Sequence, residues 1–461
     1  MVTHELDAPG ARRSRAPDLV VGALVGLGVG LRLWALGAAR LSFDETFTAV
    51  AARMPLGSLL SFLRRADAHP PLDYLLRAPL ARAGVSEAWL RAPSVVASAL
   101  TLILAAWWWR RLGRVGILAV ALLAVSPFAI VYAHDARMYA GLGLAGMVVA
   151  VASARWLERP SKRLLLVMGV GLLSALFLQG GALLVVPGVI AVAGLRRDRD
   201  AWRWRLSVIA ACLVWGVVWG RAFLDQSGRS GSSWVPLTTP HYALVVLNEL
   251  VDTTPVIAIL AVGLVIGGLL TLPSGPLRRV VACLGAGVIG TYLVMGLHFH
   301  VLLPRALAFA AWAPLLALAS LVDAALRHAR SVGVAILALV TVVVVPSTIA
   351  AAQVTRAPHA AAFDSVRRFA RPGDEVVMTP GFLRTMPTWY FGVRWWAHGS
   401  LVSRSDLAAE GIIIGGTQPT GRVWLVVSVD YPAQTAGLRA CAPPRRMGGF
   451  TVYCLDGAHG A

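Results

Sequence analysis

Long apolar runs alternate with short polar segments along most of the chain. Most of the runs approach the roughly 20 residues that a helix needs to cross the hydrocarbon core of a bilayer. We find eleven, at residues 17–37, 89–109, 115–133, 138–154, 164–178, 181–195, 206–224, 255–272, 280–297, 306–326 and 332–350. The pattern predicts a mainly α, polytopic membrane protein.

The stretch 164–195 is long for one span and short for two, and Gln179 followed by two glycines marks a turn in its middle. The positive-inside rule decides between the two readings, because clusters of Arg and Lys should share the cytoplasmic side. With two spans every such cluster lies on one side, whereas with one span the later clusters change sides. We therefore expect about eleven membrane helices in residues 17–350, after a cytoplasmic N-terminal tail at residues 1–16.

The last part of the chain, residues 351–461, has a different pattern. Strand-like runs at residues 374–380, 422–430 and 450–454 are separated by Gly and Pro, which predicts a small α/β domain. An odd number of spans places this domain on the extracytoplasmic side. Cys441 and Cys454 could form a disulfide there, whereas Cys212 and Cys283 lie in expected helices as small apolar residues.

Composition agrees with the membrane assignment. The 461 residues are 57% hydrophobic and 14% charged, and the mean hydropathy is +0.70. A soluble domain has about 45–50% apolar and about 25% charged residues. The net charge of +19 does not indicate nucleic acid binding, because the basic residues form short clusters between apolar runs rather than one polar face. The expected location is therefore the plasma membrane, with several passes through the bilayer.

Polar residues gather where the expected helices meet the outer side. Such residues are costly at membrane level unless they face a cavity or a partner, so their convergence from several helix junctions predicts a functional site. Taken singly, each is better explained as a polar residue of an ordinary outer loop. The candidates are Asp44, Glu45, His69, His134, Asp135, Arg137, Gln179 and Arg305.

Asp44 and Glu45 are adjacent, directly after the first apolar run. On a helix their side chains diverge by about 100°, so they cannot form a carboxylate pair and should have different roles. Ser42 or Asp44 could also cap a helix that starts here, and a helix N-terminus favours an ionised carboxylate. Either acid is then a capping residue or a general base for an acceptor hydroxyl.

The outer loop at residues 43–88 is expected to hold short interfacial helices. Its stretch 55–65 is amphipathic, and the double Pro after His69 forces an extended turn before a second apolar patch. His69 in this turn is a candidate substrate contact or metal ligand. Glu45 and His69 are the two candidates for a divalent metal site.

Several motifs, taken in order, carry a family resemblance. They are "SFDET" after the first span, "AHPPLDYLL" in the loop, "LRAPSVV" opening the second span, "SPFAIVYAHDARMYA" from the third into the fourth, and "LPRALAF" at the tenth. The arrangement resembles the GT-C glycosyltransferases of the protein O-mannosyltransferase and aminoarabinose transferase type. It covers about residues 17–350 and is strongest in the first third.

The resemblance implies transfer of a sugar from a polyprenyl-phosphate carrier to a glycan, glycolipid or protein acceptor on the outer face. It casts Asp44 as the base in a single displacement that inverts the anomeric centre, with Glu45 supporting the acceptor or a metal. Arg137 and Tyr139 match the family's junction near the donor phosphate, and Arg305 is a further candidate. His69, His134 and Asp135 are expected contacts of the acceptor or the loop. The sequence departs from the family at Ala306, where an aromatic residue is expected.

The residues themselves agree with this chemistry. A leaving phosphate needs positive charge, which Arg supplies as a bidentate fork, and the chain has no phosphate-binding loop or dinucleotide fingerprint. A transporter or flippase of a lipid-linked sugar is the alternative, although it would favour internal repeats and polar residues at the bilayer midplane. An outer-surface sensor or scaffold would explain the C-terminal domain but not the first loop.

Overall fold

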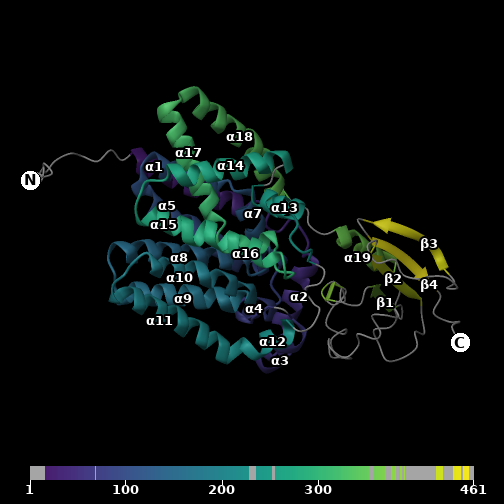
Figure 1. The fold of residues 1–461 in the computed structure, drawn as a ribbon. Coiled ribbons are helices and arrows are strands. Elements are labelled where there is room, and N and C mark those ends of the chain that lie inside the picture. The colour runs from purple at the N-terminus through teal and green to yellow at the C-terminus, as the bar shows by residue number, and fades with distance from the viewer. Residues whose placement is uncertain are drawn as a thin grey trace, which may run out of the picture.

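The structure is a computed structural model in which a helical membrane region adjoins a small domain with a β-sheet (Figure 1). It describes residues 16–67, 69–227, 235–251, 255–353 and 358–369, followed by shorter stretches between residues 375 and 455. The N-terminal tail at residues 1–15 and most of residues 380–421 lie outside the described residues.

The membrane region is built from apolar helices joined by short turns. Their bounds are α1 (Ala16–Leu33), α5 (Glu87–Trp109), α6 (Arg114–Ala124), α7 (Pro127–Ala133), α8 (Tyr139–Glu158), α9 (Lys162–Leu178), α10 (Val186–Gly194), α11 (Arg199–Trp215), α12 (Arg221–Ser227), α13 (Pro240–Val251), α14 (Pro255–Thr271), α15 (Pro276–Val280), α16 (Gly287–Gly296), α17 (Trp312–His328) and α18 (Arg330–Gln353). Within the described ranges, six helices are long and apolar enough to cross a membrane, or up to seven with one bent pair. The chain is therefore a multi-pass membrane protein, and the expected count of eleven spans stays a prediction.

The run at residues 115–133 was expected as one helix but is broken into α6 and α7, which meet at 46°. Pro127 has no N–H to donate to the carbonyl of Leu123, and the nearby carbonyls lose their helical donors. Arg32 of α1 donates to the carbonyl oxygens of Leu123 and Ala124, at 3.0 Å each. Thr348 of α18 donates to that of Val125. Side chains of neighbouring helices thus satisfy the backbone at the break.

The stretch 164–195 forms two apolar segments, as predicted. Helix α9 ends at Gln179, and the chain continues through a 3-10 turn, η2 (Gly180–Val185), into α10. Arg196, just after α10, donates to the carbonyl of Leu157 near the end of α8, at 3.1 Å. Since α9 begins shortly after Leu157, α10 returns to the end of the bundle at which α9 began.

The tenth run also differs from the expectation. Its first residues, together with Arg305, form a 3-10 segment, η5 (Pro304–Phe309), and α17 begins only at Trp312. Pro304 opens the segment, as suits a residue without an N–H. Arg305 therefore lies on a tight turn above α17 rather than at the end of a long helix.

The first outer loop contains three short helices, α2 (Phe43–Ala52), α3 (Leu56–Ala66) and α4 (Leu72–Arg82). Leu59, Phe62 and Leu63 form the buried face of α3, which the amphipathic pattern predicted. Tyr74 of α4 joins the same core. The loop is therefore packed onto the membrane region.

The C-terminal domain contains α19 (Pro358–Phe369) and four strands, β1 (Glu375–Thr379), β2 (Val423–Ser428), β3 (Ala440–Met447) and β4 (Phe450–Leu455). The order is β1-β2-β4-β3, with β1 parallel to β2 and the other pairs antiparallel. Strand β3 was not predicted, because it contains Pro443 and Pro444. Those prolines are tolerated since β3 is an edge strand with shifts in register.

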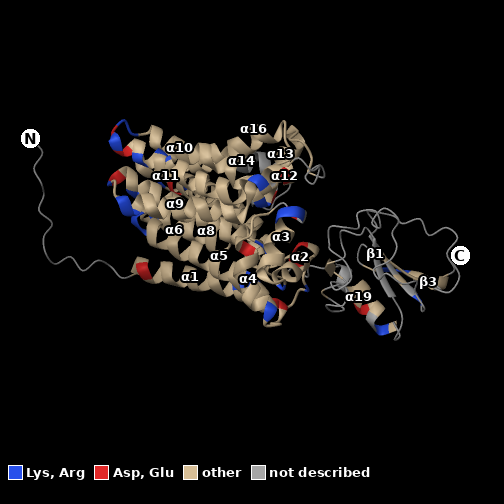
Figure 2. Cartoon of the chain, turned by 90° about the horizontal axis from the view of Figure 1, so that it is seen from below, with Lys and Arg blue, Asp and Glu red and all other residues tan. Residues whose placement is uncertain are grey.

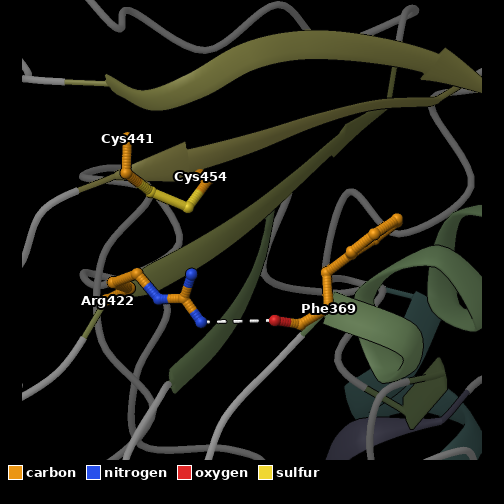
Figure 3. Close-up of a disulfide and its surroundings, with 4 residues drawn as sticks. All are labelled: Phe369, Arg422, Cys441 and Cys454. Carbon is orange, nitrogen blue, oxygen red and sulfur yellow. Dashed lines mark hydrogen bonds between the residues drawn. A yellow bond between two sulfur atoms is a disulfide. The ribbon is translucent and has the colours of Figure 1, made fainter.

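The predicted pair of cysteines forms a disulfide, Cys441–Cys454, that joins the edge strand β3 to β4 (Figure 3). Arg422, just before β2, donates to the carbonyl of Phe369 at the end of α19, at 3.2 Å (Figure 3). Phe363 of α19 packs on the sheet with Trp424 and Val452. Cys212 and Cys283 are free, as expected.

Candidate functional site

Helix α2 starts the site, and a capping box fixes its first turn. The Ser42 hydroxyl accepts the Glu45 N–H at 3.3 Å, and the Glu45 carboxylate accepts the Ser42 N–H at 2.8 Å. The predicted helix start is thus confirmed, with Ser42 as the cap. Phe43, Asp44 and Glu45 occupy successive positions of this turn, so their side chains point in three directions.

Glu45 is fully buried and faces the membrane region. Arg91 of α5 binds both its carboxylate oxygens, at 2.7 and 3.0 Å, and the Ala136 N–H donates to it at 2.9 Å. Burial raises the pKa of Glu45, but the hydrogen bonds and charge of Arg91 outweigh burial, and the pKa lies below its ordinary value. These contacts hold the Glu45 carboxylate between α5 and the turn that follows α7.

Asp44 points in another direction, to Arg305 of η5. The Arg305 Nη1 lies 2.9 Å from the Asp44 Oδ2, and the two side chains are 27% and 33% exposed. The ion pair is thus accessible, unlike the buried pair beside it. Divergent directions for the two acids are what their adjacency predicted.

Arg137 lies in the turn between α7 and α8 and contacts α2. Its Nη1 donates to the Thr48 hydroxyl at 2.8 Å and lies 3.3 Å from the Tyr74 hydroxyl. Its Nε is buried and has no hydrogen-bond partner among the described residues. A buried guanidinium with an unused donor suits an anionic ligand.

Tyr74 connects Arg137 to the first loop. Its hydroxyl donates a short hydrogen bond to the Asp67 carboxylate. Burial and the nearby charge of Asp67 raise the pKa of Tyr74 well above its ordinary value. The phenol therefore stays protonated and holds both groups in place.

His69 adds a neutral group to this basic cluster. Burial lowers its pKa well below the ordinary value of 6.5, and the charges of Arg137 and Arg305 lower it further. Its Nδ1 is buried and makes no hydrogen bond within the described part of the chain. The structure thus brings Asp44, His69, Arg137 and Arg305 together from four separate segments.

Tyr139, at the start of α8, contacts this cluster through Arg305. The Arg305 guanidinium lies over its ring at 5.5 Å from the centroid, and Tyr132 packs edge-on against it at 5.2 Å. A cavity of about 50 Å³ adjoins both tyrosines, and Arg32 and Ser98 also line it. This volume has room for a few water molecules next to the site.

His134 and Asp135 hold the turn that carries Arg137. The His134 Nε2 lies 2.9 Å from the Arg32 carbonyl, and the Asp135 carbonyl accepts from Ser94 at 2.6 Å. Their expected part in acceptor binding stays a prediction. Gln179 is buried, and its Oε1 has no partner among the residues that the structure describes.

The sequence analysis missed Arg77 and Arg91, both nearly fully buried. Arg77 forms a bidentate pair with Asp73, at 2.9 and 3.0 Å, and also binds Ser94 and the Arg137 carbonyl. Two features of the sequence could have identified them. Asp73 and Arg77 are four residues apart and share one helix face, and Arg91 lies inside an apolar helix, where an arginine requires a partner.

The described residues contain no group of three or more His, Cys, Asp or Glu side chains that could hold a metal ion. The metal site expected from Glu45 and His69 thus gains no further ligand here. Divalent metal use stays a prediction.

No family model matches the chain, and neither does any curated protein sequence. The crystal structure of ArnT from Cupriavidus metallidurans bound to undecaprenyl phosphate is 12% identical, with a TM-score of 0.62 over 96% of this chain and 98% of that chain. ArnT in the apo state is 14% identical, with a TM-score of 0.59 over 95% and 98%.

The Pmt1–Pmt2 protein O-mannosyltransferase complex of S. cerevisiae is a weaker match. Its TM-score is 0.35 at 19% identity, over 45% of this chain and 34% of that chain. The likeness to ArnT, in contrast, extends over almost the whole of both chains. The protein therefore has the GT-C fold of polytopic membrane glycosyltransferases that the sequence resemblance predicted.

Proposed function

We propose that the protein is an integral-membrane glycosyltransferase that moves a sugar from a polyprenyl-phosphate carrier to an acceptor hydroxyl on the extracytoplasmic face, with inversion. One observation carries the proposal: the accessible carboxylate of Asp44 lies 2.9 Å from Arg305, beside the buried Arg137, whose Nε has no hydrogen-bond partner among the described residues. A candidate base and a candidate phosphate site are thus adjacent, which supports the proposal because this transfer requires both groups close together.

In the proposed reaction, Asp44 takes the proton of the acceptor hydroxyl as the oxygen attacks the anomeric carbon. The bond between that carbon and the phosphate oxygen breaks, and its electron pair leaves with the polyprenyl phosphate. The products are the glycosylated acceptor, the lipid phosphate and a protonated Asp44, which then releases its proton to solvent. Attack from the side opposite the phosphate inverts the anomeric centre.

Arg305 and Arg137 would bind the donor phosphate and stabilise the charge that develops as it leaves. Arg305 is held over Tyr139 and paired with Asp44, so it links the base to the leaving group. Neutral His69 would add a hydrogen bond from its Nδ1. The lipid class is supported by ArnT, which shares the fold and was crystallised with undecaprenyl phosphate.

The test uses purified protein with polyprenyl-phosphate sugars and measures sugar transfer and donor binding. Asp44→Asn keeps the size of the side chain but removes the base, so we expect transfer to fall by about 10²- to 10⁴-fold. Donor binding should largely persist, because the arginines remain. Glu158→Gln, at the exposed end of α8, is the matched control and should transfer sugar at the wild-type rate.

Full activity of Asp44→Asn would refute the assignment of the base. If the protein instead moved the lipid-linked sugar across vesicle membranes without transferring it, the transporter alternative would replace the enzyme.

A further inference from the structure

The turn that carries Asp44 is held from two sides. Glu45 is anchored to the membrane region by Arg91. Its neighbour Phe43 packs against the core of the C-terminal domain, which includes Phe363 of α19. Asp44 lies between these two anchors, so its backbone is held on both sides.

A second contact lies one turn further along α2. The hydroxyl oxygens of Thr46 and Thr385 are 3.5 Å apart, and both side chains are almost fully buried. Phe43 and Thr46 are three residues apart and therefore share one face of the helix. That face is covered by the C-terminal domain.

Trp389 extends the contact to the far end of α2. Its ring lies 4.2 Å from the guanidinium of Arg53, the C-terminal cap of α2, and its Nε1 donates to Glu87 at the start of α5, at 3.1 Å. The same ring packs on a small cluster that includes Leu41 and Ala49. Both ends of α2 thus contact the C-terminal domain, and α19 lies beside α2 in the two views (Figures 1 and 2).

We propose that the extracytoplasmic domain is a positioning element of the transfer site, which fixes α2, and with it Asp44, through Phe43, Thr385 and Trp389. The inference rests on the proposed function, since positioning has meaning only if Asp44 is the base. Misplacement of a reacting group by about 1 Å costs on the order of 100-fold in rate, so a domain that touches no substrate can still govern the transfer.

The first test locks the contact with Thr46→Cys and Thr385→Cys in the full-length protein. The proximity of the two side chains predicts a disulfide without reductant, and the locked enzyme should transfer sugar at about the wild-type rate. Each single cysteine variant is the control. Failure of the disulfide to form, or a locked enzyme that regains activity only on reduction, would overturn the proposal.

The second test removes the anchor at Trp389. Trp389→Ala should lower kcat by about 10-fold while the KM for the donor stays the same, because the phosphate site is intact. Trp389→Phe keeps a ring over Arg53 and should restore most of the rate. Phe369→Ala removes an aromatic ring from the same domain at its contact with Arg445, and should leave kcat unchanged.

An unchanged kcat in Trp389→Ala would refute the positioning role, and so would an equal loss in Phe369→Ala. The cross-link is detected on a gel without substrate. Its formation therefore tests the contact between α2 and the C-terminal domain independently of sugar transfer. If the wild-type protein transfers no sugar, the proposed function fails and the positioning role with it, even where the cross-link forms. An active protein in which the cross-link does not form overturns the positioning role alone.

Discussion

Asp44 and Glu45 have similar chemistry and neighbouring positions, yet their surroundings separate them. Glu45 is fully buried and satisfied by Arg91 and two backbone N–H groups, while the Asp44 carboxylate stays accessible and pairs with Arg305. A buried ion pair is costly to break, since loss of one partner leaves an isolated charge. Glu45 therefore suits a fixed anchor and Asp44 a group that must meet a substrate.

His69 makes the stability of the protein sensitive to mild acid. Its pKa in the folded state lies well below 6.5, so below pH 6.5 the unfolded chain binds a proton that the folded protein does not. The contribution of His69 to the free energy of unfolding is therefore greatest above pH 6.5. It falls as the pH drops toward the pKa of His69 in the folded protein. The protein should therefore be less stable at pH 5 than at pH 7.

We expect His69→Gln to reduce this acid loss, measured as the shift in thermal unfolding midpoint between pH 7 and pH 5. His241→Gln, at an exposed position on α13, should keep the wild-type dependence. An identical shift in all three proteins would contradict the assignment to His69.

At the scale of elements, Arg305 depends on how closely η5 approaches α8. Gly146 of α8 faces the carbonyl of Phe309 at the end of η5, and a Cβ there would overlap the carbonyl group. Only a glycine allows this backbone contact. The position of the arginine is thus set partly by a residue on another helix with no side chain.

Gly146→Ala should push η5 away from α8, lower the thermal midpoint and raise the KM for the donor, because Arg305 moves. Overpacking of this kind costs about 1–3 kcal/mol. Gly143→Ala, three residues earlier, is the matched control, since its Cβ would lie 3.5 Å from the Ala308 carbonyl, an ordinary contact. Equal effects of the two substitutions would argue against the close approach.

At the scale of the whole molecule, the expected orientation in the membrane rests on charge and on one disulfide. Basic residues gather at the end of the bundle away from the sheet, with others on the first loop and α12 (Figure 2). The Cys441–Cys454 disulfide lies in the domain at the opposite end. A disulfide persists in an oxidising compartment, which favours an extracytoplasmic location for this domain.

Loss of this disulfide should loosen the C-terminal domain. The two cysteines are separated by 13 positions in the sequence. A disulfide that closes a loop of about this size stabilises the folded state by about 3 kcal/mol. We expect Cys441→Ser with Cys454→Ser to increase the rate of limited proteolysis after α19. A variant that lacks Cys212 and Cys283 should be as resistant as the wild type and become sensitive only on reduction.

Periodicity and composition alone predicted the membrane class, a helix start at α2 with Ser42 or Asp44 as its cap, three of the four described strands and two cysteines that could pair, because these depend on local pattern and chemistry. The motifs nominated Asp44, Arg137 and Arg305. Only the tertiary structure showed that Asp44 pairs with Arg305, 261 residues away, and that Glu45 pairs with Arg91. It also showed that the third apolar run is broken at Pro127. It also built β3 from a segment with two prolines. These outcomes depend on which distant groups meet, and the local sequence does not encode the partner that a buried charge or a freed carbonyl finds in the folded chain.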